Sequence, residues 1–296
     1  MSKGDFHLHS TASDGVRSPT WVMETAAANG VRVLSLTDHD TTAGYEEARG
    51  GSVKDADVVA AADRLGLRLI PGLEMSTDLG KADVHLLGFG FDVEAKPLID
   101  FMRWQREGRL TRLNTMVGIL HDYGMNVTVE RILEIAGEAS VGRPHVARAL
   151  LEAGHVASVQ EAFDLWLGNG KPADVNRERL DPAETIKIIH ENGGVVFVAH
   201  AIYIGEDYPE AVEQLARWGV DGLETYYKHY DPETIAFHEQ LSTRLGLARS
   251  GGSDYHGLGN PDDREIGDIP FPDERVDEFV AFLESKGVNT GKAASA

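Results

Sequence analysis

The chain has 296 residues, a formal net charge of −20 and no cysteine. Without cysteine, disulfide bonds and thiolate-bound zinc are excluded, so any metal ion must be bound by histidine, aspartate and glutamate. The acidic balance argues against a surface for long duplex nucleic acid, since such a surface requires clustered lysine and arginine.

Short apolar segments alternate with helical patterns over much of the chain. Strands are expected at residues 4–9, 32–37, 67–76, 83–91, 194–200, 221–226 and 247–252. Helices are expected at 18–29, 54–65, 181–192, 208–218 and 231–245. The first of these helices begins at Ser18-Pro19, an N-cap followed by proline at the first helical position. This alternation predicts an α/β fold with a mostly parallel sheet or barrel.

Residues 94–175 interrupt the alternation. Helical patterns follow one another at 95–123, 128–137, 144–153 and 158–167, with no strand between them. We interpret the segment as a helical insert or cap on an α/β body formed by residues 1–93 and 176–290. The last residues, 291–296, are small and polar, and we expect them to be a disordered tail.

Ionisable side chains lie at or just after the carboxyl ends of the expected strands. They are His7, His9, Asp38, His39, Asp40, Glu74, His200, Asp254 and His256. Active sites of α/β barrels and open α/β sheets are built from those ends. His85 lies inside its strand, where a buried histidine with a purely structural role is the alternative.

The pairs His7/His9 and Asp254/His256 have the same spacing at opposite ends of the chain. Residues i and i+2 of a strand point to the same face, so each pair can contact one ion. A single such pair is weak evidence, and Asp40 could simply cap the helix that follows it. Two matching pairs at strand ends favour a shared metal site.

The motifs HLHSTASDG (7–15), TDHD (37–40), PGLE (71–74), AH (199–200) and GSDYH (252–256) resemble those of the PHP (polymerase and histidinol phosphatase) superfamily. The resemblance implies a distorted (β/α)7 barrel with a di- or trinuclear metal centre. Segments 104–120, 141–150 and 168–175 resemble the helical insert of the stand-alone PHP phosphoesterases. Those proteins remove the 3′-phosphate from 3′,5′-bisphosphonucleotides such as pAp, and related members trim short RNA from 5′ to 3′.

The resemblance also implies the ligands of the metal centre. One ion would be bound by His7, His9, Glu74 and Asp254, a second by Glu74, His85 and His200, and a third by Asp14, His39 and His256. Asp38 and Asp40 would orient the imidazoles from outside the ligand set. We expect two or three divalent ions, of manganese, iron, zinc or magnesium, and no organic cofactor.

The insert is expected to select the substrate. Arg143 and His145 follow a glycine at a predicted helix start, where free N–H groups favour anions. Lys171 is the next candidate, followed by Arg106 and Arg109, for which a solvated helix face is the alternative. The remaining histidines are interpreted as structural or surface residues: His121, His155, His190, His229 and His238.

The sequence thus predicts a metal-dependent phosphatase of small nucleotides, acting through a metal-activated hydroxide. A short-RNA 5′–3′ exoribonuclease, a histidinol-phosphate phosphatase and a non-catalytic metal-binding module are the alternatives. No stretch reaches the roughly 18 apolar residues of a membrane helix, and the start lacks the pattern of a signal peptide. We therefore expect a cytoplasmic protein without membrane contact. The oligomeric state cannot be predicted from the sequence.

Overall fold

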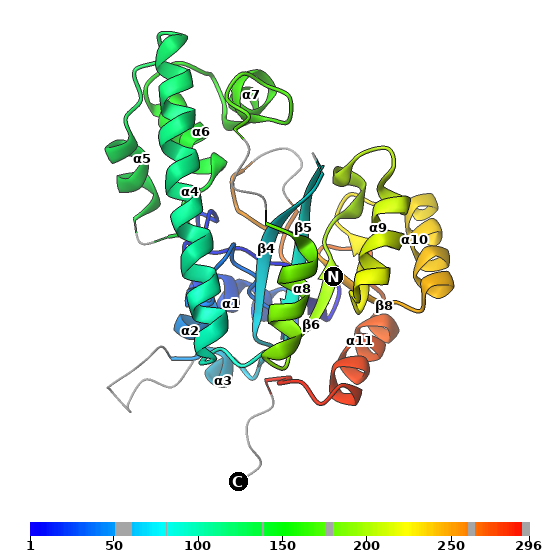
Figure 1. Ribbon diagram of the computed structural model, residues 1–296. Coiled ribbons are helices and arrows are strands. Elements are labelled where there is room, and N and C mark those ends of the chain that lie inside the picture. The colour runs from blue at the N-terminus through cyan, green and yellow to red at the C-terminus, as the bar shows by residue number, and fades with distance from the viewer. Residues whose placement is uncertain (51–60, 81, 138, 176–179, 260–263, 292–296) are drawn as a thin grey trace.

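The computed structural model describes residues 1–50, 61–80, 82–137, 139–175, 180–259 and 264–291, and all structural statements concern these residues (Figure 1). The strands are β1 (Gly4–Asp5), β2 (Val33–Leu34), β3 (Arg68–Leu69), β4 (Gly72–Leu79), β5 (Ala82–Phe89), β6 (Val195–Val198), β7 (Gly222–Tyr227) and β8 (Ala248–Gly252). They form a three-stranded sheet in the order β1-β2-β3 and a five-stranded sheet in the order β4-β5-β6-β7-β8.

The two sheets meet through isolated bridges, Leu8 with Tyr255 and His39 with Glu74, but they are not closed into one barrel. The predicted α/β class is confirmed, whereas a (β/α)7 barrel is not. The expectation of a mostly parallel sheet is wrong for β5, which runs antiparallel to both β4 and β6. Only two residues separate β4 from β5, and a connection this short can join only antiparallel strands.

The predicted strand at 67–76 is two strands, because Pro71 separates β3 from β4. Proline has no N–H group, so it cannot donate to a neighbouring strand at that position. After this interruption the chain leaves the first sheet and begins the second. Glu74 in β4 therefore lies only a few residues after the segment that connects the two sheets.

Most predicted helices are confirmed, within one or two residues at each end. The helices are α1 (Pro19–Ala28), α2 (Ala43–Ala48), α3 (Ala61–Leu65), α4 (Lys96–Asp122), α5 (Val129–Ala136), α6 (Arg143–Glu152), α7 (Val159–Ala162), α8 (Pro182–Glu191), α9 (Tyr208–Trp218), α10 (Pro232–Leu245) and α11 (Asp273–Ser285). A π-helix, η1 (Phe163–Leu167), follows α7, and a 3₁₀ turn, η2 (Ala201–Ile204), follows β6. No helix among them is both long and apolar enough to cross a membrane.

Two helix predictions need comment. The helix expected at 54–65 is present from Ala61 onward, and residues 54–60 lie outside the described part of the chain. Helix α11 was not predicted, although Val276, Phe279 and Leu283 have helical spacing and are buried. The tail expected at 291–296 also lies outside the described residues, apart from its first residue.

Helix α4 stands along one side of the sheets and carries α5, α6 and α7 at its far end (Figure 1). Near its start, Leu98 and Met102 pack into the core that covers the five-stranded sheet. Beyond its middle, Leu113 and the apolar residues that follow belong to a second core, which extends to Ala173. One helix thus contributes to both cores. The division of the chain at residues 94 and 175 stays a prediction.

Segments from the N-terminal and C-terminal parts of the chain are connected by hydrogen bonds beside β1. The buried Asp5 carboxylate accepts hydrogen bonds from the backbone N–H groups of Ser253 and Gly267, each at 2.9 Å. Burial raises the pKa of Asp5 to about 6, although these hydrogen bonds act in the opposite direction. Gly252 is required in this arrangement, because a Cβ atom there would overlap the Cβ of His7. The N-terminal and C-terminal histidine motifs therefore lie side by side.

His238 on α10 is fully buried, with Nε2 at 3.2 Å from the hydroxyl of Tyr208. Burial lowers its pKa to about 4. Since the unfolded chain takes up this proton below about pH 6.5 and the folded chain only near pH 4, the stability present at neutral pH is lost as the pH falls through this interval. We expect the free energy of unfolding to fall by about 2 kcal/mol more in the native chain than in His238→Gln between pH 7.5 and pH 5.

Urea unfolding of both proteins at the two pH values, with a chelator present, measures this difference. All other titrating groups are common to the two chains and cancel in the comparison. Equal losses of stability would show that His238 is readily protonated in the folded state.

Candidate metal centre

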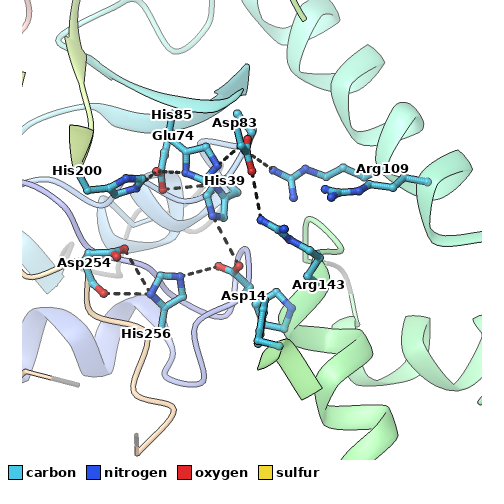
Figure 2. A pocket seen from close by; sticks show the side chains of 15 residues that line it. Asp14, His39, Glu74, Asp83, His85, Arg109, Arg143, His200, Asp254 and His256 are labelled. Atoms are coloured by element: carbon cyan, nitrogen blue, oxygen red, sulfur yellow. Dashed lines mark hydrogen bonds and ion pairs between the residues drawn. The ribbon is translucent and has the colours of Figure 1, made fainter. Parts of the chain in front are cut away.

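A cavity of about 190 Å³ lies between the strand ends and the predicted insert (Figure 2). One wall carries the imidazoles and carboxylates that the sequence singled out. The opposite wall carries Arg109 and Arg112 from α4, Arg143 at the start of α6, and Phe163. In Figure 2 the guanidinium groups of Arg109 and Arg143 point across the cavity toward the acidic and histidine side chains.

Glu74 is the centre of the first wall and is buried. Five imidazole nitrogens surround its two carboxylate oxygens: Nδ1 of His85 at 2.7 Å, Nε2 of His9 at 3.0 Å, Nε2 of His7 and of His200 each at 3.1 Å, and Nδ1 of His39 at 3.4 Å. Burial alone would raise the pKa of Glu74, but the surrounding histidines hold it well below its usual value. The carboxylate therefore stays ionised.

Three overlapping groups of side chains bring their ligand atoms within 4.8 Å of one another. They are His7, His9, Glu74 and Asp254; His39, Glu74 and His85; and His9, Asp14, His39 and His256. The first group is the set that the family resemblance implies for one ion. The second contains His39 where the resemblance has His200. The third adds His9 to the implied set. All nine predicted ligands thus lie around one centre, and their role as ligands stays a prediction.

The donor atoms fit a divalent cation. Nε2 of His9, Oδ1 of Asp14 and Nδ1 of His39 are buried and make no hydrogen bond of regular geometry among the described residues, although each lies within 3.4 Å of a carboxylate oxygen or an imidazole nitrogen. Buried polar atoms without a regular hydrogen bond are rare and costly in a folded protein, so their convergence indicates a group that would bind them. Imidazole nitrogen and carboxylate oxygen together suit zinc, manganese and iron in the divalent state.

Protons and cations compete for these atoms. Burial lowers the pKa of His9, but Asp254, Glu74 and Asp14 more than compensate and raise it to about 10. Burial likewise favours the neutral form of Asp14, whereas His39 and His256 hold its pKa well below the usual value. Burial lowers the pKa of His39 to about 3, so the cluster combines ionised carboxylates with one basic imidazole, His9, and one neutral imidazole, His39. Divalent cations can take the place of the imidazole protons in such a site.

The backbone is strained at the same place. Asp40, His200 and Asp254 have φ values of +52°, +23° and +46°, and they are the non-glycine residues with positive φ in the described part of the chain. Such conformations cost roughly 1–3 kcal/mol each and are typical of functional sites. His200 and Asp254 are both predicted ligands. The backbone is therefore strained at two residues whose side chains lie in the predicted metal centre.

Asp38 and Asp40 differ in what they contact. Asp38 accepts hydrogen bonds from the backbone and hydroxyl of Ser10, both at 2.8 Å, and from the hydroxyl of Ser13 at 2.6 Å. The Ser13 hydroxyl lies 3.4 Å from Nδ1 of His9, so Asp38 reaches an imidazole through this serine. The carboxylate of Asp40 instead forms an ion pair with Nε of Arg109 at 2.5 Å.

This ion pair corrects the solvated-face interpretation of Arg109. The side chain is only 8 % exposed, because it projects from α4 toward the sheets and contacts Asp40 and Ser76. Arg106 is also turned inward, and its guanidinium donates to the Asp40 carbonyl at 2.7 Å. Arg112, one turn beyond Arg109, lines the cavity but was missed. Its i,i+3 spacing from Arg109 on a helix is the signal that could have revealed it.

The three predicted phosphate-binding residues are placed differently. Arg143 lines the cavity, where its guanidinium donates to Asp83 and to Asn169, each at 3.2 Å. His145 is buried, and its Nδ1 accepts a hydrogen bond from the Gly142 backbone at 3.0 Å, which closes the first turn of α6. Lys171 is exposed in the turn after η1, outside the described lining of the cavity.

Sequence reasoning also missed side chains from β7 and the turn that follows it. Glu224 contacts His7 and His200, the hydroxyl of Tyr227 donates to Asp254 at 2.8 Å, and Lys228 donates to the Asp254 carbonyl at 2.8 Å. The available signal was a glutamate within an apolar strand, in the segment DGLETY (221–226). A buried carboxylate in such a strand requires a partner.

Comparisons with known proteins support the same class of site. A 5′-3′ exoribonuclease of Haemophilus influenzae is 33% identical over 86% of this chain and 90% of its own length. A 3′,5′-nucleoside bisphosphate phosphatase of Chromobacterium violaceum is 30% identical over 91% and 93%. The structure described as a metal-dependent phosphoesterase from Bifidobacterium adolescentis has a TM-score of 0.80 and 28% identity, over 94% of this chain and 95% of that one. No protein-family model matches the chain.

Fold, site and relatives together define a phosphoesterase with a histidine–carboxylate centre suited to divalent metal ions. The chain belongs to the PHP superfamily of phosphoesterases and is a hydrolase. The resemblance drawn from its motifs is thereby confirmed at the level of the superfamily.

Proposed function

We propose that the protein removes the 3′-phosphate from 3′,5′-bisphosphonucleotides, converting pAp to AMP. The observation that carries this proposal is one cavity with two regions suited to phosphate: the candidate metal centre on one wall and Arg112 and Arg143 on the other. A substrate with two phosphate groups can occupy both regions at once. The bisphosphate phosphatase relative supports the same substrate class.

In this proposal Glu74 and the eight other predicted ligands around it hold two or three divalent ions. Such ions, when bound, act as Lewis acids toward phosphoryl oxygens and make water a stronger acid. The protein contributes the arrangement of the site. Glu74 belongs to two of the three groups, Asp254 to one of these two, and Asp14 to the third.

The opposite wall, from the predicted insert at 94–175, binds the phosphate that is retained. Arg143 projects from the first turn of α6, where guanidinium and helix N-terminus both favour an anion. Phe163 supplies the apolar side of the cavity, and an aromatic ring there can stack on a nucleobase of any identity. The insert thereby distinguishes a nucleotide from a simple phosphate monoester.

A substrate panel tests the proposal after reconstitution with Mn²⁺: pAp, histidinol phosphate, p-nitrophenyl phosphate and a short 5′-phosphorylated RNA. We expect kcat/KM to be largest for pAp, with AMP and inorganic phosphate as the products. Preference for histidinol phosphate would contradict the proposal. Absence of turnover on every substrate with metal fully bound would favour the non-catalytic module.

A 5′–3′ exoribonuclease of short RNA is the second candidate. It is favoured by the Haemophilus influenzae relative of that name, which matches this chain over most of its length. Stepwise release of mononucleotides from the RNA in the same panel, faster than pAp hydrolysis, would establish this alternative.

Replacing Arg143 by alanine is expected to raise KM for pAp by about 10- to 100-fold, because a charged hydrogen bond is worth roughly 1.5–3 kcal/mol. Hydrolysis of p-nitrophenyl phosphate should change little, since that substrate has no second phosphate. Arg131→Ala is the matched control, because Arg131 is an exposed arginine of the same region that pairs with Glu134 and Glu152. Equal losses on both substrates would contradict the role of Arg143 in specificity.

A further inference from the structure

Glu224 is a fully buried carboxylate in β7. It does not line the cavity, and it belongs to none of the three ligand groups described above. It nevertheless contacts two of the predicted ligands. One oxygen lies 3.0 Å from Nδ1 of His7, and the other accepts a hydrogen bond from the backbone N–H of His200 at 2.7 Å. His7 and His200 lie far apart in the sequence and follow the ends of β1 and β6, so Glu224 connects two separate segments.

Both contacts require hydrogen-bond donors opposite Glu224. The backbone N–H of His200 can only donate, and an ionised carboxylate can only accept. Nδ1 of His7 must therefore carry a proton, because a bare nitrogen would place its lone pair against the carboxylate. A neutral imidazole has a single N–H group, so Nε2 of His7 is left with a lone pair.

Nε2 of His7 points into the centre. It lies 3.1 Å from Oε2 of Glu74 and 3.4 Å from Oδ1 of Asp254. A lone pair that faces two carboxylate oxygens is repelled by both unless a proton or a metal ion lies between them. A divalent cation at this point would be bound by all three atoms at once.

We propose that Glu224 is a positioning residue that fixes His7 as the Nδ1–H tautomer, so that Nε2 faces the cation, and that holds the His200 backbone in its left-handed conformation. This inference rests on the proposed metal centre. His200 has φ +23°, and its N–H bond to Glu224 helps to maintain this unfavourable geometry. One carboxylate thus aligns an imidazole and a strained backbone at the same time.

Glutamine cannot replace Glu224 in this role. A side-chain amide has one accepting oxygen and one donating NH₂ group. Whichever way it is turned, either His7 or His200 meets an N–H group instead of an acceptor. Glu224→Gln therefore keeps the size and shape of the side chain but breaks one of the two contacts.

We expect Glu224→Gln to weaken binding of Mn²⁺ or Zn²⁺ about 10- to 100-fold, as is typical when the partner of a metal-binding histidine is changed. Competition with a chromophoric chelator measures this affinity without a substrate. KM for pAp should change little while kcat falls. Glu239→Gln is the matched control: Glu239 is a carboxylate of the neighbouring helix α10 that accepts from Tyr226 and pairs with Arg275, so metal affinity should match the native chain.

A measurement on the native protein covers the case in which Glu224→Gln fails to fold. In the Zn²⁺-loaded protein, long-range ¹H–¹⁵N correlations report which imidazole nitrogen carries the proton, and the His7 signal is assigned by its loss in His7→Gln. A proton on Nδ1 supports the proposal, and a metal-bound Nδ1 overturns it. Unchanged metal affinity in folded Glu224→Gln also overturns it. If the native chain itself binds no divalent metal, the proposed function fails together with this inference.

Discussion

Replacing Glu74 by glutamine is expected to lower kcat by at least about 10³-fold, equivalent to roughly 4 kcal/mol of transition-state stabilisation. Glu74 belongs to two of the three candidate ligand groups: the group of His7 and His9, and the group of His39 and His85. Glutamine has nearly the same shape but no charge. It therefore leaves five surrounding imidazoles without the carboxylate on which they converge.

Metal content should fall in the same variant, and elemental analysis after gel filtration measures it beside the rate of pAp hydrolysis. Glu24→Gln is a suitable control, because Glu24 is half exposed and pairs with Arg64 on the surface. Its kcat and metal content should equal those of the native chain. A Glu74→Gln protein that kept its metal and most of its kcat would refute the proposed centre.

The ion pair between Arg109 and Asp40 leads to the largest expected effect on stability. Replacing Arg109 by methionine should lower the free energy of unfolding by about 3–5 kcal/mol, because it leaves Asp40 buried and charged without its partner. Asp40 is fully buried, and its backbone is also strained by a positive φ. Urea unfolding at pH 7.5 with a chelator measures the change without a contribution from bound metal.

Two further variants separate the ion pair from general packing. Asp40→Asn combined with Arg109→Met should lose less stability than Arg109→Met alone, since the uncompensated charge is then absent. Arg103→Met on the same helix should change stability by less than about 1 kcal/mol, because Arg103 is 60% exposed and its pair with Asp100 is a surface contact. A similar small loss for Arg109→Met would show that its contact with Asp40 contributes little.

Much of the site could be predicted because its residues obey local rules. His7 and His9 alternate along a strand-like segment and fall in one ligand group, as their spacing predicts. Asp254 and His256 fall in different groups, because Asp254 has a positive φ and does not follow the alternation of a strand. The positions after strands were equally informative for His200, since parallel strand ends meet at one edge. The same reasoning placed the helices, whose caps and spacing are local features.

The remaining features depend on contacts between distant segments. The pairing of Asp40 with Arg109, of Glu224 with His7 and of Arg143 with Asp83 joins residues that no local pattern relates. Asp40 was accordingly expected to orient an imidazole, whereas its carboxylate pairs with an arginine. The antiparallel β5 was missed for a different reason: apolar periodicity reports burial and says nothing about the direction of a strand.

Helix α4 has one more consequence, for how proteins of this kind can diversify. Its 27 residues span about 40 Å as a single element, and it buries side chains in both apolar cores. From Leu113 onward its buried side chains belong to the second core, so substitutions there can reshape the wall that carries Arg112 and Arg143 while the core of the five-stranded sheet is unchanged. New substrate preferences could thus arise by substitutions near the C-terminal end of α4, while its N-terminal end stays packed on the sheet and the catalytic chemistry is unchanged.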